Sequence, residues 1–231
     1  MLRLSLIALA LVPGTALAQA YQCRAPERFE VPGAFTAREP RRALPISAYS
    51  LVASWSPEWC RSHPEDRSMQ CNAANGRFGF ILHGFWPEGR PGASPQWCAV
   101  RPAPDARTLR EHLCMTPNPG LLAHEWAKRG SCMARTPRAY FRSAAVLWRS
   151  IRWPDADSLS RRDGLTVGEL RAAFLVINPE WRGEQLVINT SRTGWLTEVR
   201  LCYRRDFMPG NCARASRGAP DSEPLRIWRG L

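Results

Sequence analysis

Residues 78–86 constrain the fold of this chain more than any other stretch. The segment is rich in aromatic and aliphatic side chains, contains no Asp, Glu, Lys or Arg, and is bounded by Gly76 and Pro87. A run of this length and character predicts a β-strand that is buried on both faces. His83 lies in its middle, and a histidine in a core strand more often has a structural than a catalytic role. Gly84 follows, and a glycine in a strand lets another group approach the backbone closely.

The remaining pattern predicts strands before and after a helical region. A strand over residues 49–55 ends at Ser56-Pro57, and strands over 185–190 and 195–203 flank a hairpin loop. Helices are predicted between them, over residues 106–114, around residue 124, from 137 to a point before Pro154, and from 167 to about 176. This order predicts an α+β domain with a central antiparallel sheet and packed helices.

Two of these helices carry clear start signals. Thr136 is a predicted N-cap, and Pro137 occupies the first helical position. Thr166 and Glu169 have the spacing of a capping box. In the helix over residues 106–114, leucines 109 and 113 are expected to point inward and His112 to lie on the surface.

Three segments are predicted to lack regular structure. Residues 19–46 are rich in proline and arginine and form an irregular lead-in, and residues 61–76 form a polar loop. Residues 213–231 are expected to form a loosely held tail. His63, in the polar loop, is given no role.

The N-terminus has the pattern of a secretory signal peptide over residues 1–18. A positive charge precedes an apolar run over residues 4–12, and small residues at 16 and 18 provide a cleavage site. Neither this run nor any later stretch is long enough to span a bilayer. We therefore expect a secreted or periplasmic, monomeric protein with a single domain over residues 19–231 and no membrane partner.

The cysteines point to a chain stabilised by disulfides. All eight follow the signal: Cys23, Cys60, Cys71, Cys98, Cys114, Cys132, Cys202 and Cys212. An even number in an exported chain predicts four disulfides. Cys60 and Cys71 are close enough in sequence for a local bridge, and Cys202 and Cys212 bracket a Pro-Gly loop. No C-x-x-C pair is present and the four histidines are scattered, so no metal site or other cofactor is predicted.

The charge favours a polyanionic partner. The formal net charge is +12, and 31 of the 32 basic residues are arginine. A surface of this kind suits RNA or DNA better than a membrane. Many exported proteins are basic without binding nucleic acid, so the charge alone does not decide the function.

Lys128 is the only lysine in the chain, and its neighbours suggest a reason. If the surrounding stretch is helical, His124, Glu125, Lys128 and Arg129 fall within an arc of about 140°. An imidazole, an acid and two cations then share one side of the helix. The alternative is a solvated helix face with an ordinary Glu125–Arg129 pair at i,i+4.

His83 and this helix face are far apart in the sequence. If the fold places them across a cleft, they supply the groups that metal-free cleavage of RNA requires. One group takes the proton from the 2′-hydroxyl, another gives a proton to the leaving 5′-oxygen, and a fixed cation balances the charge that grows on the phosphorane oxygens. Histidine suits both transfers because its ordinary pKa is near neutral.

Two motifs make this sequence resemble the ribonuclease T2 family. LHGFWPE over residues 82–88 is similar to the family's first active-site segment, and HEWAKRGSC over residues 124–132 is similar to its second. Residues 49–57 with Cys60, and the strand that ends at residues 198–202, add support in the right order. The resemblance implies an α+β fold and metal-independent endonucleolytic cleavage of single-stranded RNA, through 2′,3′-cyclic phosphates to 3′-phosphate ends.

The resemblance also implies roles for individual residues. The catalytic residues would be His83, His124, Glu125 and Lys128, and the substrate-binding residues would be Trp86, Glu88 and Arg129. Trp86 would stack on a base and Glu88 would hydrogen-bond to it. The pairing found in the family favours Cys98–Cys132 and Cys202–Cys212. With Cys60 bridged to Cys71, Cys23 and Cys114 remain as the fourth pair.

Arg129 departs from the family pattern, which has a second catalytic histidine at this position. Guanidinium stays protonated and cannot act as a general base, although it can hold a phosphate with two hydrogen bonds. Three outcomes stay open. His124 or Glu125 takes over the proton transfer, the protein cleaves RNA slowly, or it is a secreted RNA-binding or inhibitory relative without activity. We expect an active or weakly active ribonuclease.

Overall fold

The computed structural model describes residues 20–37, 39–90, 93–213, 216 and 218–230. The signal peptide expected over residues 1–18 lies outside these residues. Within the described part of the chain, no helix combines the length and the apolar character needed to cross a membrane.

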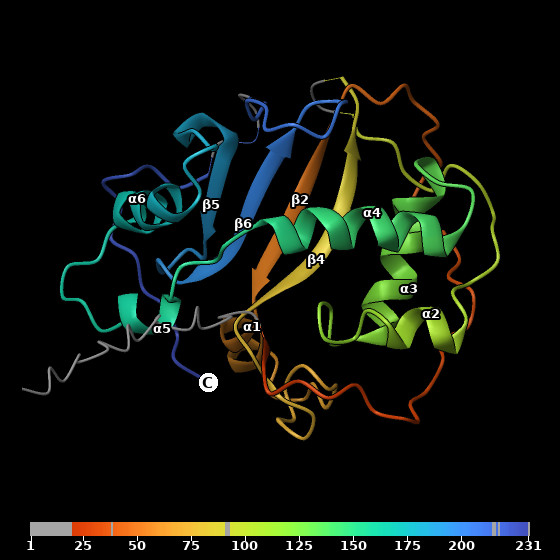
Figure 1. Cartoon of the computed structure of the whole chain (residues 1–231), viewed down its shortest axis with the longest axis horizontal. Helices are drawn as coiled ribbons and strands as arrows, with labels where there is room; N and C mark the ends of the chain where they lie inside the picture. The colour runs from red at the N-terminus through yellow and green to blue at the C-terminus, as the bar shows by residue number, and fades with distance from the viewer. Residues whose placement is uncertain (1–19, 38, 91–92, 214–215, 217, 231) are drawn as a thin grey trace, which may run out of the picture.

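A four-stranded antiparallel sheet forms the centre of the domain, in the order β4-β2-β6-β5 (Figure 1). The strands are β2 (Ala48–Trp55), β4 (Phe80–Glu88), β5 (Leu186–Thr190) and β6 (Leu196–Tyr203). A separate two-stranded ribbon pairs β1 (Ala20–Tyr21) with β3 (Arg77–Phe78). The predicted α+β fold with an antiparallel sheet is confirmed.

β4 contains most of the segment that the sequence marks as buried. It lies at the edge of the sheet, yet its outer edge is covered. Leu82 donates its backbone N–H to Met115 and accepts a hydrogen bond at its carbonyl from the Thr116 hydroxyl. These contacts occupy an edge that would otherwise offer free backbone groups to another strand.

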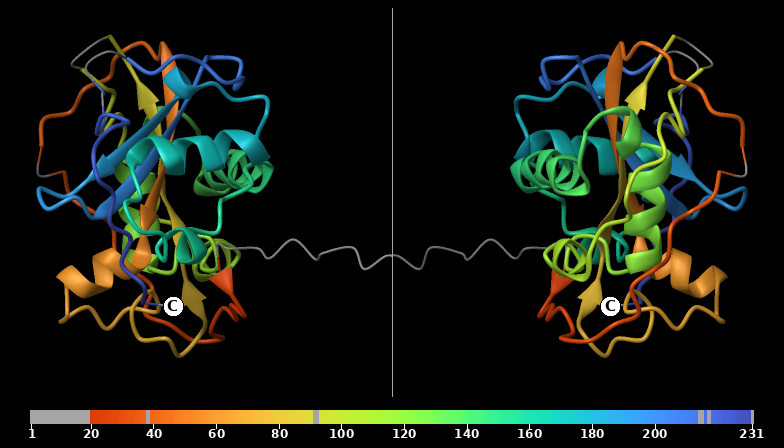
Figure 2. Two further views of the ribbon diagram at one scale, coloured as in Figure 1. Left: turned by 90° about the vertical axis from the view of Figure 1, so that its left-hand side faces the viewer. Right: turned by 90° about the vertical axis from the view of Figure 1, so that its right-hand side faces the viewer.

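The helices are α1 (Ser56–Ser62), α2 (Ala106–Arg110), α3 (Pro119–Lys128), α4 (Pro137–Ser150), α5 (Ala156–Leu159) and α6 (Val167–Ile177), with short 3-10 turns η1 (Gly130–Cys132) and η2 (Gly183–Gln185). α4 and α6 pack on one face of the sheet, α2 and α3 lie beside β4, and α1 follows the end of β2 (Figure 1). α4 and α6 lie on the same side of the sheet (Figure 2). The Tyr140 hydroxyl bonds both the N–H and the carbonyl of Phe85, which ties α4 to β4.

The predicted helix caps are confirmed. Thr136 accepts a hydrogen bond from the backbone N–H of Ala139, with Pro137 in the first turn. The Thr166–Glu169 capping box is formed in both directions. These local signals fix where α4 and α6 begin.

Two expectations are wrong. His112 is only 8% exposed, because the chain turns after α2 and places its ring 5.2 Å from that of Phe141. The end of the chain is also held firmly: Leu225 and Ile227 are buried, and Leu225 donates its N–H to the carbonyl of Leu165. Apolar side chains at alternate positions of the tail complete the core, and this pairing across the chain is not visible in the local sequence.

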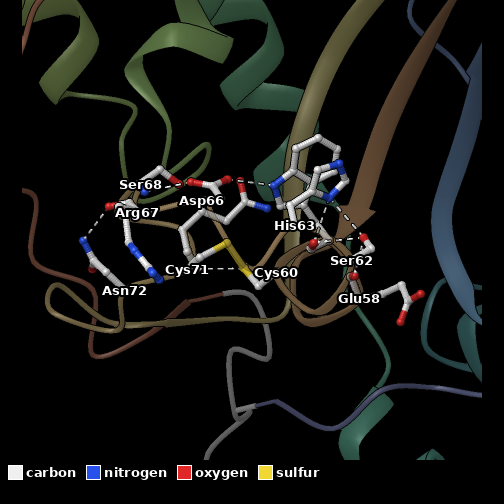
Figure 3. Close-up of a disulfide and its surroundings, with 11 residues drawn as sticks. Glu58, Cys60, Ser62, His63, Asp66, Arg67, Ser68, Cys71 and Asn72 are labelled. Atoms are coloured by element: carbon white, nitrogen blue, oxygen red, sulfur yellow. Dashed lines mark hydrogen bonds between the residues drawn. A yellow bond between two sulfur atoms is a disulfide. The ribbon is translucent and has the colours of Figure 1, made fainter.

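All four predicted disulfides are formed: Cys23–Cys114, Cys60–Cys71, Cys98–Cys132 and Cys202–Cys212. Cys60–Cys71 closes the polar loop after α1 (Figure 3). In this loop Asp66 accepts hydrogen bonds from the Trp59 indole and the Ser68 backbone, and the His63 ring stacks on Trp59 at 3.7 Å. His63 thus has a local structural partner.

Candidate active site

A β-bulge places His83 at the centre of the candidate site. Ala53 of β2 pairs with Leu82, and the next pair joins Val52 to Gly84, so His83 is an extra residue in β4. A bulge bends the strand locally and re-aims a side chain. The His83 side chain is 33% exposed, whereas its neighbours in β4 are buried.

The neighbouring strands β2 and β6 supply polar groups around this imidazole. The Ser54 hydroxyl lies 3.2 Å from His83 Nδ1, and a carboxylate oxygen of Glu198 lies 3.8 Å from the same nitrogen. Ser54 and Glu198 are direct cross-strand partners. Their neighbours Ala53 and Val199 point into the core. Because side chains alternate along a strand, Ser54 and Glu198 lie on the opposite face of the sheet.

Glu125 of α3 approaches His83 from the other side. Its Oε1 lies 3.9 Å from His83 Nε2, and its Oε2 accepts a 2.6 Å hydrogen bond from the Trp86 indole. Gly84 makes this approach possible, because a Cβ there would lie 2.3 Å from Oε2 of Glu125 and 2.4 Å from Nε1 of Trp86. The prediction that another group approaches the backbone closely at Gly84 is confirmed. The groups that do so are the side chains of Glu125 and Trp86.

Burial moves the pKa values of these two groups in opposite directions. Desolvation lowers the pKa of His83 to about 4, assisted by the positive charges of His124, Arg129 and Arg200, in that order. Desolvation raises the pKa of Glu125 to about 7, against the opposing effects of Arg129 and the Trp86 hydrogen bond. Pairs of groups whose environments separate their pKa values often divide the roles of acid and base. At mildly acidic pH, His83 is neutral while Glu125 holds a proton.

Two guanidinium groups lie over Trp86. The Cζ atoms of Arg129 and Arg200 are 5.1 and 5.0 Å from the centroid of its ring. The Nε atom of each arginine is buried and has no hydrogen-bond partner. Arg200 also lies 3.6 Å from Glu198. The site therefore concentrates fixed positive charge beside the His83–Glu125 pair.

Glu88, a predicted base-binding residue, has partners within the protein. Its carboxylate accepts hydrogen bonds from the hydroxyls of Ser50 and Ser94, at 2.7 and 2.6 Å. Arg200 lies 3.9 Å from it. The base-binding roles of Trp86 and Glu88 stay predictions, and the geometry puts both residues on the strand that carries His83.

His124 and Lys128 face a second group of partners that come from the lead-in. The Lys128 ammonium lies 2.6 Å from a carboxylate oxygen of Glu39, which also accepts from the Trp97 indole. The His124 ring packs edge-on against Trp97 and Phe35. Burial is the main cause that lowers the pKa of His124, and the charge of Lys128 acts in the same direction.

The predicted helical face is thus divided. α3 ends at Lys128, and Arg129 leaves the helix to reach toward Trp86. The structure brings His83, Glu125, Trp86 and Arg129 together, and it places His124 and Lys128 beside Glu39. The direct meeting of His83 with Lys128 across a pocket stays a prediction, although Lys128 is near enough to influence the pKa of Glu125.

Sequence reasoning missed Glu198, Arg200 and Glu39. The first two left a signal: they are the only charged residues of strand β6, at alternate positions. Glu39 left none, because the lead-in has no periodic pattern. Among the described residues, no group of three His, Cys, Asp or Glu side chains has an arrangement that would hold a metal ion.

Comparison with known proteins shows what this chain resembles. The model of the ribonuclease T2 family matches residues 46–159, which include both motifs. A probable ribonuclease of Haemophilus influenzae is 29% identical over 180 residues, covering 73% of this chain and 61% of the relative. A ribonuclease of Aeromonas hydrophila is 34% identical over 114 residues, covering 49% of this chain and 50% of the relative. The chain thus matches only part of the length of these two relatives.

The fold also has solved counterparts. Trichomaglin, described as an S-like ribonuclease, superposes with a TM-score of 0.62 at 18% identity, covering 79% of this chain and 98% of trichomaglin. At this level of identity the likeness concerns the fold.

Proposed function

Because this chain belongs to the ribonuclease T2 family, we propose that it is a metal-independent endoribonuclease that cleaves single-stranded RNA by transesterification. The products would be 2′,3′-cyclic phosphates and then 3′-phosphate ends. The observation that carries this proposal is the His83–Glu125 pair: an imidazole and a buried carboxyl 3.9 Å apart, with opposite pKa shifts, beside two guanidinium groups.

His83 acts as the base in the first step. Its lowered pKa keeps the imidazole neutral at mildly acidic and neutral pH, so it can take the proton from the 2′-hydroxyl. The 2′-oxygen attacks phosphorus, and the bond from phosphorus to the 5′-oxygen breaks. Ser54 and Glu198 lie at Nδ1 and leave Nε2, on the side of Glu125, for the transfer.

Glu125 acts as the acid in that step. Its raised pKa leaves it protonated below about pH 7, and it gives this proton to the departing 5′-oxygen. In the second step the roles reverse. Ionised Glu125 takes a proton from water, the water oxygen bonds to phosphorus, and protonated His83 returns its proton to the 2′-oxygen as that bond breaks.

Arg129 stabilises charge in place of transferring a proton. Its guanidinium lies near Glu125 and over Trp86, where it can balance the charge that grows on the phosphorane oxygens. We assign the transfer that the family gives to a second histidine to Glu125 rather than to His124. The His124 ring is packed between Phe35 and Trp97, whereas Glu125 directly faces His83.

The remaining residues bind and place the substrate. Trp86 and Glu88 hold a base, and Lys128 attracts a phosphate that displaces Glu39 from its ammonium. Four disulfides suit an oxidising compartment, so we place the protein in the periplasm or outside the cell.

The test is cleavage without metal. Purified mature protein is incubated with a single-stranded RNA in EDTA from pH 3 to 9, and the new 3′ ends are identified. We expect cyclic phosphates first and 3′-phosphates later.

A second candidate is a secreted RNA-binding protein without activity, which Arg129 and the Glu39–Lys128 contact favour. RNA binding with no cyclic or 3′-phosphate product at any pH would establish this alternative and end the enzyme proposal.

A further inference from the structure

A second cluster of tryptophan and arginine lies outside the site described above. The rings of Trp195 and Trp228 meet edge to face, with centroids 5.5 Å apart. Arg226 lies 4.0 Å from the Trp195 ring, and Arg61 lies within 5.2 Å of both rings. Trp228 is 39% exposed, which is a large apolar surface to leave in water.

The two tryptophans line an open hollow of about 590 Å³. Arg162, Arg226 and Arg229 also line it, and Asp163 is the one acidic residue among the described residues of its wall, which together carry a net charge of +2. We call this surface the Trp195–Trp228 hollow. Aromatic faces among guanidinium groups are the combination by which proteins hold single-stranded nucleic acid without reading its sequence.

Hydrogen bonds and an ion pair hold parts of the wall of the hollow in place. Arg226 bonds through its backbone to Gly194 on one side and Leu196 on the other, and the Trp228 carbonyl accepts a hydrogen bond from the buried Trp55 indole. The Arg61 guanidinium is fixed by a 2.6 Å ion pair with Glu58. Because the stacking surfaces are already ordered, a ligand would lose little of its binding energy to ordering them.

The hollow lies along the strands that carry the His83 site. Trp195 comes three residues before Glu198, a distance of roughly 10 Å along a strand, and the extra residue Thr197 between them offsets the alternation that would otherwise put the two side chains on opposite faces. On the neighbouring strand, Ser54 contacts His83, and α1 with Arg61 begins directly after that strand ends at Trp55. A polynucleotide bound at His83 can therefore extend to the hollow.

We propose that the Trp195–Trp228 hollow binds a nucleotide of single-stranded RNA that lies outside the cleaved phosphodiester. This inference rests on the proposed function. The base stacks on the exposed face of Trp228, and Arg162 and Arg229 contact the flanking phosphates. The hollow thus favours long RNA over short RNA and contributes nothing to the cleavage of a dinucleotide.

The test compares substrates of two lengths. The variant Arg162→Gln/Arg229→Gln is assayed on a dinucleotide and on a 12-nucleotide RNA, with Arg138→Gln/Arg142→Gln on the exposed side of α4 as a control that loses the same charge. We expect kcat/KM for the 12-nucleotide RNA to fall at least about fivefold and that for the dinucleotide to stay unchanged. Trp228→Leu, which keeps apolar bulk against Arg61, should act in the same direction.

Equal losses on both substrates, equal losses in the control, or no loss on the longer RNA would each overturn the proposal. A 2′-O-methyl oligonucleotide, which lacks the attacking hydroxyl, separates this inference from the proposed function. Its binding should weaken in the Arg162→Gln/Arg229→Gln variant, and the slope of log affinity against log salt should fall by about 1.4. If the wild-type protein cleaves neither RNA, the proposed activity fails, and this binding measurement alone decides whether the hollow contacts RNA.

Discussion

The two ends of one helical motif have different surroundings. Glu125 is buried, with 6% of its side chain exposed, and it faces His83 and Trp86 on β4. Lys128, one turn later, is paired with Glu39 from the lead-in, a carboxylate that is 47% exposed. The first environment separates the pKa values of two proton carriers, and the second holds a cation with a displaceable partner. We infer that the first region performs the proton transfers and the second attracts the phosphate.

The largest effect should come from His83→Ala, which removes the base. We expect the cleavage rate to fall by about 10²–10⁴-fold. The matched control is His63→Ala, since that ring lies on the surface loop and stacks on Trp59. Equal activity of the two variants would show that the site is misplaced.

The second-largest loss of activity should come from Glu125→Gln. This variant keeps the Trp86 contact but removes the proton that Glu125 donates. The expected loss is about 10²-fold at pH 6, with Glu65→Gln on the exposed loop as the control. If Glu125→Gln is fully active and His124→Ala is inactive, then His124, in the region of Lys128, transfers the proton. The roles that we infer for the two regions would then be wrong.

Arg129→His should raise turnover by about tenfold, because it adds a group that can transfer protons beside Glu125. Arg129→Gln is the control, since it removes the charge without adding such a group, and it should lower turnover. A lower rate in Arg129→His, equal to that of Arg129→Gln, would contradict this prediction, because it would show that the charge of Arg129 matters and that an added proton carrier does not.

The smallest effect should come from Glu39→Gln, which frees the Lys128 ammonium for substrate. An exposed ion pair contributes up to about 1 kcal/mol, so KM should fall by at most about fivefold with little change in kcat. Glu30→Gln in the same lead-in is the control. A rise in KM would show that Glu39 orients Lys128 for the substrate instead of competing with it.

Much of this architecture could be predicted from the sequence, and the exceptions share a cause. Strands, caps and the four disulfides follow from local patterns, spacing or family pairing, and they are confirmed. The bulge at His83 depends on the register between β2 and β4, which no single strand encodes. The same holds for Glu198 beside His83, for the burial of His112, and for the tail residues Leu225 and Ile227, since each depends on a partner distant in the chain.

The sequence predicted which residues form the candidate site better than it predicted which of them contact one another. The motifs gave His83, Glu125, Trp86 and Arg129, which the structure brings together. The helical periodicity predicted that Lys128 lies with them. In the structure its ammonium instead forms an ion pair with Glu39 from the irregular lead-in. A contact made by a segment without a pattern cannot be read from the pattern of the helix.

The pH dependence of dinucleotide cleavage tests the central claim most directly. Activity requires neutral His83, so it should fall as the pH drops through about 4, and it requires protonated Glu125, so it should fall as the pH rises through about 7. In EDTA we predict a bell-shaped kcat/KM profile with limbs near these values, and a Glu125→Gln variant that lacks the upper limb. A rate that keeps rising above pH 7, or an upper limb that persists in Glu125→Gln, would contradict the account.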